Sequence, residues 1–228
     1  LCAIYCLGRK IMQVRLDDLK AVTLTVLARS GYPADEAQII LDVLLYAQLR
    51  GNNQGIVKLI GAGMPRSANA RPIQITRETK LSALLDGGWN AGMVALTRAV
   101  DITMDKAREH GIGLVGTNQT NTSTGAIGYY ASRAAQAGFI AFVFSGSGEY
   151  VAMHGSYEPL FGTNPLAIAI PTTDQPIVFD MATSAIARFG IVEAKTAGRP
   201  IPEGVAYDAN GQPTTDAAAA LQGAIRTF

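Results

Sequence analysis

Apolar residues recur every three or four positions between residues 17 and 50, which is the period of an amphipathic helix. The run that follows Asp17 and Asp18 predicts a first helix, capped by one of these carboxylates and ended by Gly31. The same spacing from Ala34 to Arg50 predicts a second helix, which Gly51 ends. The chain therefore begins with a helical region.

The pattern changes around residue 80. Residues 61–80 combine glycine, proline and mixed charge without a period, and residues 81–86 then have the pattern of a short strand closed by two glycines. A long helix is expected from Ala91 to His110, because apolar positions return at helical spacing and Gly111 follows them.

Strand and helix patterns alternate in the rest of the chain. We expect strands at 112–116, 139–144, 166–170 and 177–179, a small-residue helix at 125–137, and a further element at 190–195. The strand at 112–116, the helix after it and the strand at 139–144 resemble a strand–helix–strand unit.

Composition and charge narrow the class of protein. A chain of 228 residues with 48% hydrophobic and 16% charged residues is globular, and it is neither disordered nor fibrous. The net charge of +1 creates no field that would attract nucleic acid or an anionic membrane, and no uncharged stretch approaches the ~20 residues that span a bilayer. We therefore expect a small-molecule ligand, no nucleic-acid or membrane partner and, by default, a cytoplasmic location.

Residues 1–11 are interpreted as an extension, because the amphipathic pattern begins only after Met12. Their apolar start lacks the basic region and cleavage site of a signal peptide. Both cysteines, Cys2 and Cys6, lie in this extension, and two neighbouring cysteines support neither a disulfide framework nor a metal site.

The remaining chain is divided at the change of pattern into a helical N-terminal region (12–80) and a second domain (81–228). The last residues before Phe228 contain neither a capping residue nor a charged tail. The second domain is therefore expected to be incomplete at its C-terminus.

The glycine pattern Gly111-x-Gly113-x-x-Gly116 has the letters of a dinucleotide-binding motif. That motif must follow a strand and open a helix, so that the helix N-terminus meets the pyrophosphate. Here the glycines follow a helix and enter a strand. We interpret them as a helix stop and a strand boundary.

A polar cluster follows the second helix, from Arg50 to Lys58, with Asn53 and Gln54 between the two cations. Arg50 offers a bidentate fork, Lys58 a point charge and the amides fixed donors and acceptors, which together suit a carboxylate. Asparagine and glycine are also ordinary turn residues, and composition alone favours a solvated loop.

Eight small polar residues fill the stretch from Asn118 to Gly125, between an expected strand and an expected helix. Serine, threonine and asparagine are preferred helix caps, which explains one or two of them. Loops that follow strands commonly carry binding sites, and the number of hydroxyl groups favours a ligand here.

Two further candidates lie near expected strands. Asp180, at the end of the strand that starts at 177, could bond a ribose hydroxyl or cap a helix that begins at Thr183, and the cap is the favoured interpretation. The glycine-rich loop from Ser145 to Asn164 could form a cofactor groove. Its His154 fits a structural hydrogen-bonding role and an acid–base role equally well.

At these same residues the chain resembles the malate/L-lactate dehydrogenase family, which also includes sulfolactate dehydrogenases and cyclic-imine carboxylate reductases. The resemblance covers Met12 to Phe228, and it rests on the order and spacing of five segments. These are Leu49–Gly51, Gly125–Tyr130, Phe161–Ala167, Phe179–Thr183 and Gly211–Asp216.

The resemblance implies an α+β fold that binds NAD(P) without a Rossmann domain. A helical N-terminal region would join a mixed, largely antiparallel sheet with helices, and the cofactor, NAD or NADP, would bind between the subunits of a homodimer. The cofactor-binding residues implied in this way are Ser147, Val178, Phe179, Asp180, Met181, Ala182 and Thr183, and we add Thr163 and Asn164 from the glycine-rich loop.

The chain departs from the family pattern at two positions. Gln54 and Ser123 stand where relatives carry histidines, and neither side chain titrates near neutral pH. Lys58 matches the position at which relatives carry a cation that binds the substrate carboxylate. Our hypothesis is that Lys58 and Arg50 hold the carboxylate, that Asn53, Gln54 and Ser123 orient the reacting atom, and that His154 supplies the proton.

Three functions remain open at this point. The resemblance implies hydride transfer between the nicotinamide and a small 2-hydroxy or 2-oxo acid. Reduction of a cyclic imino acid is an alternative, because an iminium already carries its proton and needs no enzyme acid. The loss of both histidines also fits an inactive binding module or a fragment of the family.

Overall fold

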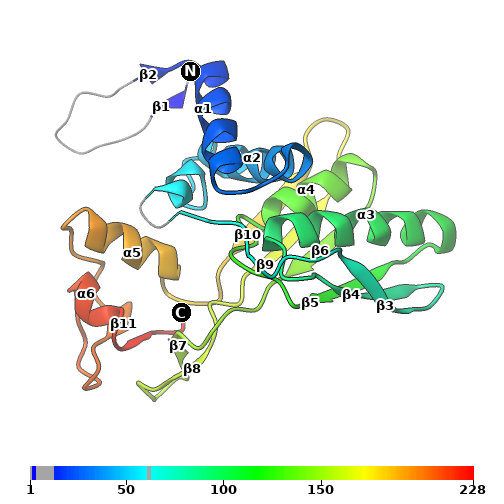
Figure 1. Cartoon of the computed structure of the whole chain (residues 1–228). Coiled ribbons are helices and arrows are strands. Elements are labelled where there is room, and N and C mark those ends of the chain that lie inside the picture. The colour runs from blue at the N-terminus through cyan, green and yellow to red at the C-terminus, as the bar shows by residue number, and fades with distance from the viewer. Residues whose placement is uncertain (1, 4–12, 61–62) are drawn as a thin grey trace.

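The computed structural model describes residues 2–3, 13–60 and 63–228 (Figure 1). Of the expected extension 1–11, only β1 (Cys2–Ala3) is described, and it pairs antiparallel with β2 (Gln13–Val14). Cys6 and Met12 lie outside the described residues.

The two N-terminal helices are confirmed as α1 (Leu16–Arg29) and α2 (Ala34–Gln48). The expected cap of α1 was wrong: the N-cap residue is Arg15, which makes no capping side-chain bond, and Asp17 and Asp18 lie inside the first turn. There their charges favour the positive end of the helix dipole. The two helices pack against each other, and α2 also packs against α3 and α4, which are described below.

The first sheet contains β3 (Gln74–Glu78), β4 (Ser82–Asp86) and β5 (Leu114–Asn118), in that order. β3 is antiparallel to β4, whereas β5 is parallel to it. The parallel pair is joined by the expected long helix, α3 (Gly92–His110), which packs on both strands. This β4–α3–β5 segment is the strand–helix–strand unit of the fold.

Two glycines of the Gly-x-Gly pattern shape the turn between α3 and β5. Gly111 caps α3 with a φ of +83°, in the left-handed region that glycine adopts without strain. At Gly113 a Cβ atom would press directly on the carbonyl oxygen of Thr103 in α3. The interpretation of these residues as a helix stop and a strand boundary is confirmed.

The second sheet is antiparallel throughout and has the order β10 (Ile177–Met181), β9 (Leu166–Ile170), β6 (Ala141–Phe144). One face of it is covered by α4 (Gly128–Gln136). The strand–helix–strand unit expected from β5, α4 and β6 was therefore wrong, because β5 and β6 belong to different sheets.

The main core lies between the helices and these two sheets. Ile40, Leu44 and Met93 are fully buried there, together with Tyr130 of α4. The Tyr130 hydroxyl donates to the carbonyl oxygen of Thr124 at 2.7 Å, and burial raises the pKa of this phenol well above its usual value. This hydrogen bond ties the polar stretch before α4 to the core.

A smaller lobe forms around α5 (Arg188–Thr196), which is the element expected at 190–195. Its own core includes Val151, Ile191, Ile201 and Ile225. Its other elements are β7 (Val151–Ala152), β8 (Pro159–Phe161), β11 (Ala206–Tyr207), α6 (Ala217–Ala220) and β12 (Ala224–Ile225), and its sheet order is β11-β12-β7-β8.

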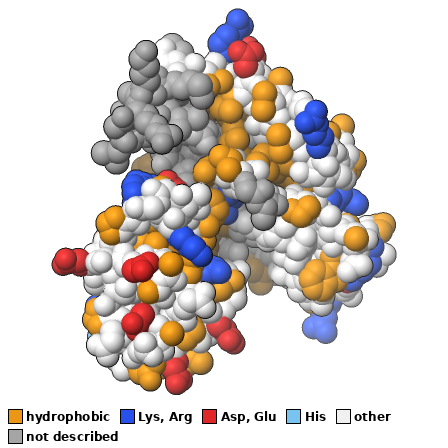
Figure 2. Space-filling model, turned by 60° about the vertical axis from the view of Figure 1, so that its left-hand side comes forward, with side chains coloured by type: hydrophobic (Ala, Val, Ile, Leu, Met, Phe, Trp, Pro, Cys, Tyr) orange, Lys and Arg blue, Asp and Glu red, His pale blue; other side chains and the backbone are white. Residues whose placement is uncertain are grey.

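The expected α+β class with mixed, largely antiparallel sheets is confirmed. In Figure 1 the lobe of α5 and α6 lies to one side of the helices and sheets that form the main core. Figure 2, turned so that this side comes forward, shows the surface hollowed between the lower lobe and the rest of the molecule. None of the helices in the described ranges is long and apolar enough to cross a bilayer.

Candidate functional site

A single groove with a volume of about 1560 Å³ runs between the two sheets and the start of α5. Its wall is built from segments that lie far apart in the sequence. These are the loop after α2, the inner side of α3 and β5, the polar stretch before α4, β6 with the loop after it, the end of β10, and the first turns of α5.

Asn53, Gln54, Lys58 and Ser123 all line this groove. Gln54 is oriented by its neighbours: its backbone N–H donates to Oδ1 of Asn52 at 2.9 Å, and its side-chain amide donates to Oδ1 of Asn53 at 3.2 Å. The hydroxyl oxygen of Ser123 accepts from the backbone N–H of Gly125 at 3.0 Å. The loop favoured as solvated by composition is thus part of the groove.

Lys58 lies on a short 3₁₀ helix, η1 (Ile56–Leu59), and lines the groove together with the first turns of α5. Its ammonium nitrogen is 4.4 Å from the centroid of the Phe189 ring, and none of the ion pairs in the described part of the chain includes it. Burial lowers the pKa of Lys58 from 10.5 to about 8. The site therefore holds a cation that loses its charge unusually easily.

Replacing Lys58 with methionine should stabilise the fold at neutral pH. The lowered pKa means that the charged amine costs folding free energy below pH 8, and this cost is relieved as the pH rises from about 8 to 10.5. We expect Lys58→Met to raise the free energy of unfolding by ~1–2 kcal/mol at pH 7, with the difference shrinking toward pH 10. Urea unfolding at both pH values measures it, and a difference that does not change with pH would contradict the argument.

A second group of residues meets where the loop before β9 passes the end of β10. The hydroxyl oxygen of Ser147 accepts from the backbone N–H of Thr163 at 3.1 Å. Thr183 donates from its backbone N–H to the carbonyl oxygen of Thr163 at 2.9 Å and from its hydroxyl to that of Asn164 at 3.1 Å. Of these four, Ser147 and Thr163 line the groove.

Asp180, Met181 and Ala182 also line the groove, whereas Val178 lies outside the lining and packs against the main core. The expected cap at Thr183 was wrong, because the next helix begins at Arg188. Asp180 instead accepts a hydrogen bond at 2.8 Å from the backbone N–H of Gly128, the first residue of α4, which has no cap of its own. Partial burial raises the pKa of Asp180, and the Gly128 hydrogen bond opposes this.

Two substitutions separate the cap from the charge at Asp180. Asp180→Ala leaves the Gly128 N–H without its acceptor and should cost ~1 kcal/mol of stability. Asp180→Asn keeps an acceptor and removes a charge that burial disfavours, so it should stay within ~0.5 kcal/mol of the parent at neutral pH. Thermal unfolding of both variants tests this, and equal losses would mean that the charge itself stabilises the fold.

Several of the expected site residues lie elsewhere. Arg50 turns away from the groove: its guanidinium stacks 3.6 Å from the Tyr46 ring centroid and donates to the Tyr46 carbonyl oxygen. His154 is exposed in the turn after β7 and does not line the groove. Asn164, Phe179 and Thr183 also lie outside the lining.

The groove contains residues that the sequence patterns did not single out. Arg188 lines it, with its guanidinium 4.1 Å from the Tyr150 ring centroid. Leu114, Phe142 and Phe144 form an apolar wall, and they are 70%, 61% and 70% exposed. The only sequence signal for Arg188 was its place just before an element of unassigned type.

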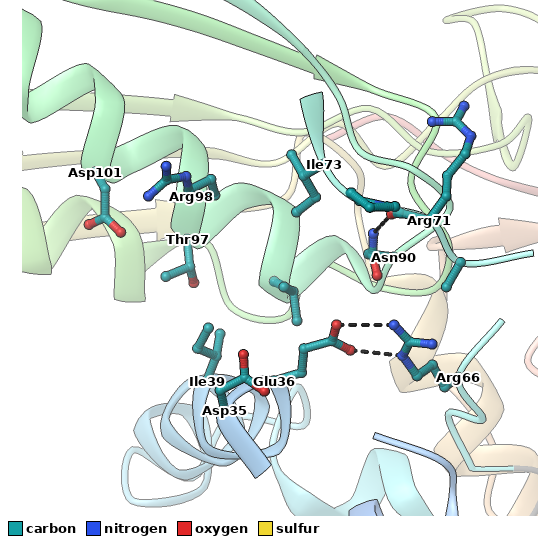
Figure 3. A pocket seen from close by; sticks show the side chains of 13 residues that line it. Asp35, Glu36, Ile39, Arg66, Arg71, Ile73, Asn90, Thr97, Arg98 and Asp101 are labelled. Carbon is teal, nitrogen blue, oxygen red and sulfur yellow. Dashed lines mark hydrogen bonds and ion pairs between the residues drawn. The ribbon is translucent and has the colours of Figure 1, made fainter. Parts of the chain in front are cut away.

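A second, smaller cavity of about 520 Å³ lies between α2 and α3 (Figure 3). Arg66 and Glu36 face each other at its edge and form two hydrogen bonds, at 3.0 and 3.2 Å. Arg71 pairs with Asp86, and Asp101 pairs with Arg133. Because most of its charges are already neutralised within the protein, this cavity is a weaker candidate for a charged ligand. Within the described ranges, no three His, Cys, Asp or Glu side chains come together as metal ligands.

Comparison with solved structures gives the same fold. A dehydrogenase from Sinorhizobium meliloti is 32% identical with a TM-score of 0.86, over 95% of this chain and 65% of that one. A Δ1-piperideine-2-carboxylate reductase from Pseudomonas syringae is 26% identical with a TM-score of 0.81, over 95% of this chain and 67% of that one.

Comparison of sequences gives related proteins. The chain is 37% identical to an L-sulfolactate dehydrogenase from Methanothermobacter thermautotrophicus, over 95% of its own length and 65% of that protein. It is 36% identical to a Δ1-pyrroline-2-carboxylate reductase from Pseudomonas fluorescens, over 93% of its length and 65% of that protein. The chain thus spans about two thirds of the length of such relatives. Residues 14–228 match the family model for malate/L-lactate dehydrogenase, and the chain belongs to this family.

Proposed function

We propose that the protein is an NAD(P)-dependent oxidoreductase. It would reduce a small 2-oxo acid to the 2-hydroxy acid and catalyse the reverse oxidation. One observation carries the proposal. A single groove is lined by Asn53, Gln54, Lys58 and Ser123 and also by Ser147, Thr163 and the 180–182 segment, which are substrate and cofactor residues predicted from the sequence.

The groove fits a dinucleotide with a substrate beside it. Its volume of about 1560 Å³ exceeds the ~300–1,000 Å³ of an ordinary ligand pocket. Ser147, Thr163 and the backbone of the loop after β6 offer hydrogen bonds to phosphate and ribose oxygens, and the apolar wall with Phe142 and Phe144 accepts flat rings. When bound, the reduced nicotinamide supplies a hydride.

The substrate would lie at the end of the groove that carries Lys58. Two cations line the groove, Lys58 and Arg188, and a 2-oxo acid brings a carboxylate to them. The side chains of Gln54 and Ser123, already oriented by local hydrogen bonds, would hold the reacting oxygen. Arg50 and His154 have no part in this arrangement, because neither lines the groove.

The test is turnover. The protein should oxidise NADH or NADPH when oxaloacetate, pyruvate or sulfopyruvate is added, as followed by the absorbance of the reduced nicotinamide. Turnover of none of these acids, under conditions in which a reduced nicotinamide binds, would refute the 2-oxo acid function.

A cyclic imino acid is the second candidate, and the residues at the two histidine positions favour it. Gln54 and Ser123 cannot donate a proton near neutral pH, and an iminium substrate needs none. The likeness to a pyrroline-2-carboxylate reductase supports the same choice. Including Δ1-piperideine-2-carboxylate in the screen separates the candidates: it should be the better substrate by kcat/KM if imine reduction is the function.

The family further implies a homodimer, and the cytoplasmic location stays an expectation from the sequence. Phe142, Phe144 and Phe179 lie exposed on one face of the second sheet, and a second subunit could cover part of such a face. Sedimentation of the protein with and without reduced nicotinamide tests this expectation, and a monomer under both conditions would contradict it.

A further inference from the structure

Two cations of different chemistry, Lys58 and Arg188, line the groove. Lys58 lies against the ring of Phe189, at 4.4 Å, and Arg188 lies against the ring of Tyr150, at 4.1 Å. Neither has a carboxylate partner among the ion pairs of the described residues. Both are held by aromatic faces, which leaves their charges available to a ligand.

The two cations differ in what they can do. A guanidinium stays charged throughout the physiological range and presents a planar fork that matches a carboxylate. An ammonium that is buried without a counter-ion gives up a proton more readily, and burial lowers the pKa of Lys58 to about 8. The groove therefore contains one permanent cation and one cation that titrates near working pH.

The surroundings of Lys58 contain few other titrating groups. The titratable and charged side chains that share the groove with it are Tyr130, Tyr150, Asp180 and Arg188. Helix α2, which packs against η1, contributes no side chain to the groove lining. Burial raises the pKa of Tyr130 and of Asp180, and Tyr130 is therefore neutral at neutral pH. Asp180 is engaged as the acceptor of the Gly128 N–H at the start of α4.

We propose that Lys58 is the proton donor for carbonyl reduction and that Arg188 holds the substrate carboxylate. This assignment rests on the proposed function and refines it. Lys58 would donate the proton that Gln54 and Ser123 cannot donate. It replaces His154 as the expected proton donor, because His154 does not line the groove.

The proton balance is simple. As the carbonyl carbon receives the hydride from the reduced nicotinamide, an N–H bond of the Lys58 ammonium breaks and an O–H bond forms on the carbonyl oxygen. The 2-oxo acid is reduced to the 2-hydroxy acid, the nicotinamide is oxidised, and Lys58 is left as a neutral amine. It then takes a proton from solvent.

The first test needs no turnover. A side-chain NMR titration of the lysines, with the Lys58 signal assigned by its absence in Lys58→Arg, should show this amine titrating near pH 8. Addition of pyruvate, as the carboxylate probe, should shift the Lys58 signal, and Arg188→Met should abolish that shift. A titration at the ~10.4 of free lysine would overturn the assignment, whatever the activity of the protein.

The second test divides the two roles by kinetics. Lys58→Arg keeps a cation but cannot release a proton, so kcat for a 2-oxo acid should fall ~100- to 10,000-fold with little change in KM, and the loss of rate above pH 8 should vanish. Reduction of Δ1-piperideine-2-carboxylate should stay within a few-fold. Arg188→Met should instead raise KM ~10-fold or more. The matched control is Lys195→Arg, an exposed lysine on α5 outside the groove, which should behave as the parent.

Two outcomes would overturn the assignment. If Lys58→Arg retains kcat and raises KM, Lys58 is the carboxylate cation and not the acid. If Arg188→Met leaves KM unchanged, the carboxylate is held elsewhere. A parent protein that reduces neither substrate would refute the proposed function, and the NMR titration would still decide the state of Lys58.

Discussion

Gly113→Ala should destabilise the protein by ~3 kcal/mol or more, whereas Gly111→Ala should cost only ~1–2 kcal/mol. A Cβ atom at Gly113 would press on the Thr103 carbonyl oxygen and lie 3.2 Å from the Ala107 nitrogen, so α3 would have to move away from β5. At Gly111 the same atom would meet nothing within 4 Å, and only the left-handed φ of +83° is unfavourable.

Thermal and urea unfolding of the two variants measure this difference. For a chain of this size the Gly113 variant should melt ~6–12 °C below the parent. The pair also tests the interpretation of the Gly-x-Gly pattern. If Gly113→Ala folded with parental stability but lost nucleotide binding, the glycine would serve a phosphate and not the packing of a helix on a strand.

Ser147→Glu should weaken binding of reduced nicotinamide dinucleotide ~100-fold. Ser147 lines the groove in the loop after β6, and a carboxylate there would face the phosphates that we place in this part of the groove. Repulsion of ~2–3 kcal/mol is expected for like charges a few ångströms apart at a half-solvated site.

The matched variant is Ser147→Ala, which removes the acceptor for the Thr163 N–H without adding charge. It should weaken binding only ~3- to 10-fold. Fluorescence titration with NADH and NADPH measures both variants. Equal affinities of Ser147→Glu and the parent would place the phosphates away from this loop.

The long elements of the fold follow from the sequence because their patterns are strong. Helices α2 and α3 and strand β9 were predicted to within about two residues, since each joins a clear apolar period to a glycine or polar boundary. The strand β3 was missed because all five of its residues are exposed, so its sequence shows no buried face. Strands of two or three residues, such as β7 and β12, are defined only by pairing between distant segments.

Local sequence could not reveal which side chains meet across the fold. Asp180 was expected to cap a helix beginning at Thr183, whereas the helix it caps begins at Gly128, 52 residues earlier. Arg50 suits a carboxylate by its chemistry, yet it stacks on Tyr46, four residues earlier near the end of α2. The position of Arg188 in the groove depends on how the lobe of α5 packs, which no local pattern encodes.

The family resemblance added what local patterns could not. Gln54 and Ser123 are ordinary residues of polar loops, and only the family resemblance implies that a histidine is expected at each position. The structure then places both in one groove with Lys58. The proposal for Lys58 follows from that juxtaposition.

The most direct test of the account is the titration of NADH and NADPH into this 228-residue chain, followed by nicotinamide fluorescence. The account predicts saturable binding of at least one of them, at one site per chain, that Ser147→Glu weakens and Lys195→Arg leaves unchanged. Absence of saturable binding of both cofactors up to ~1 mM would contradict the claim that this groove holds a nicotinamide dinucleotide.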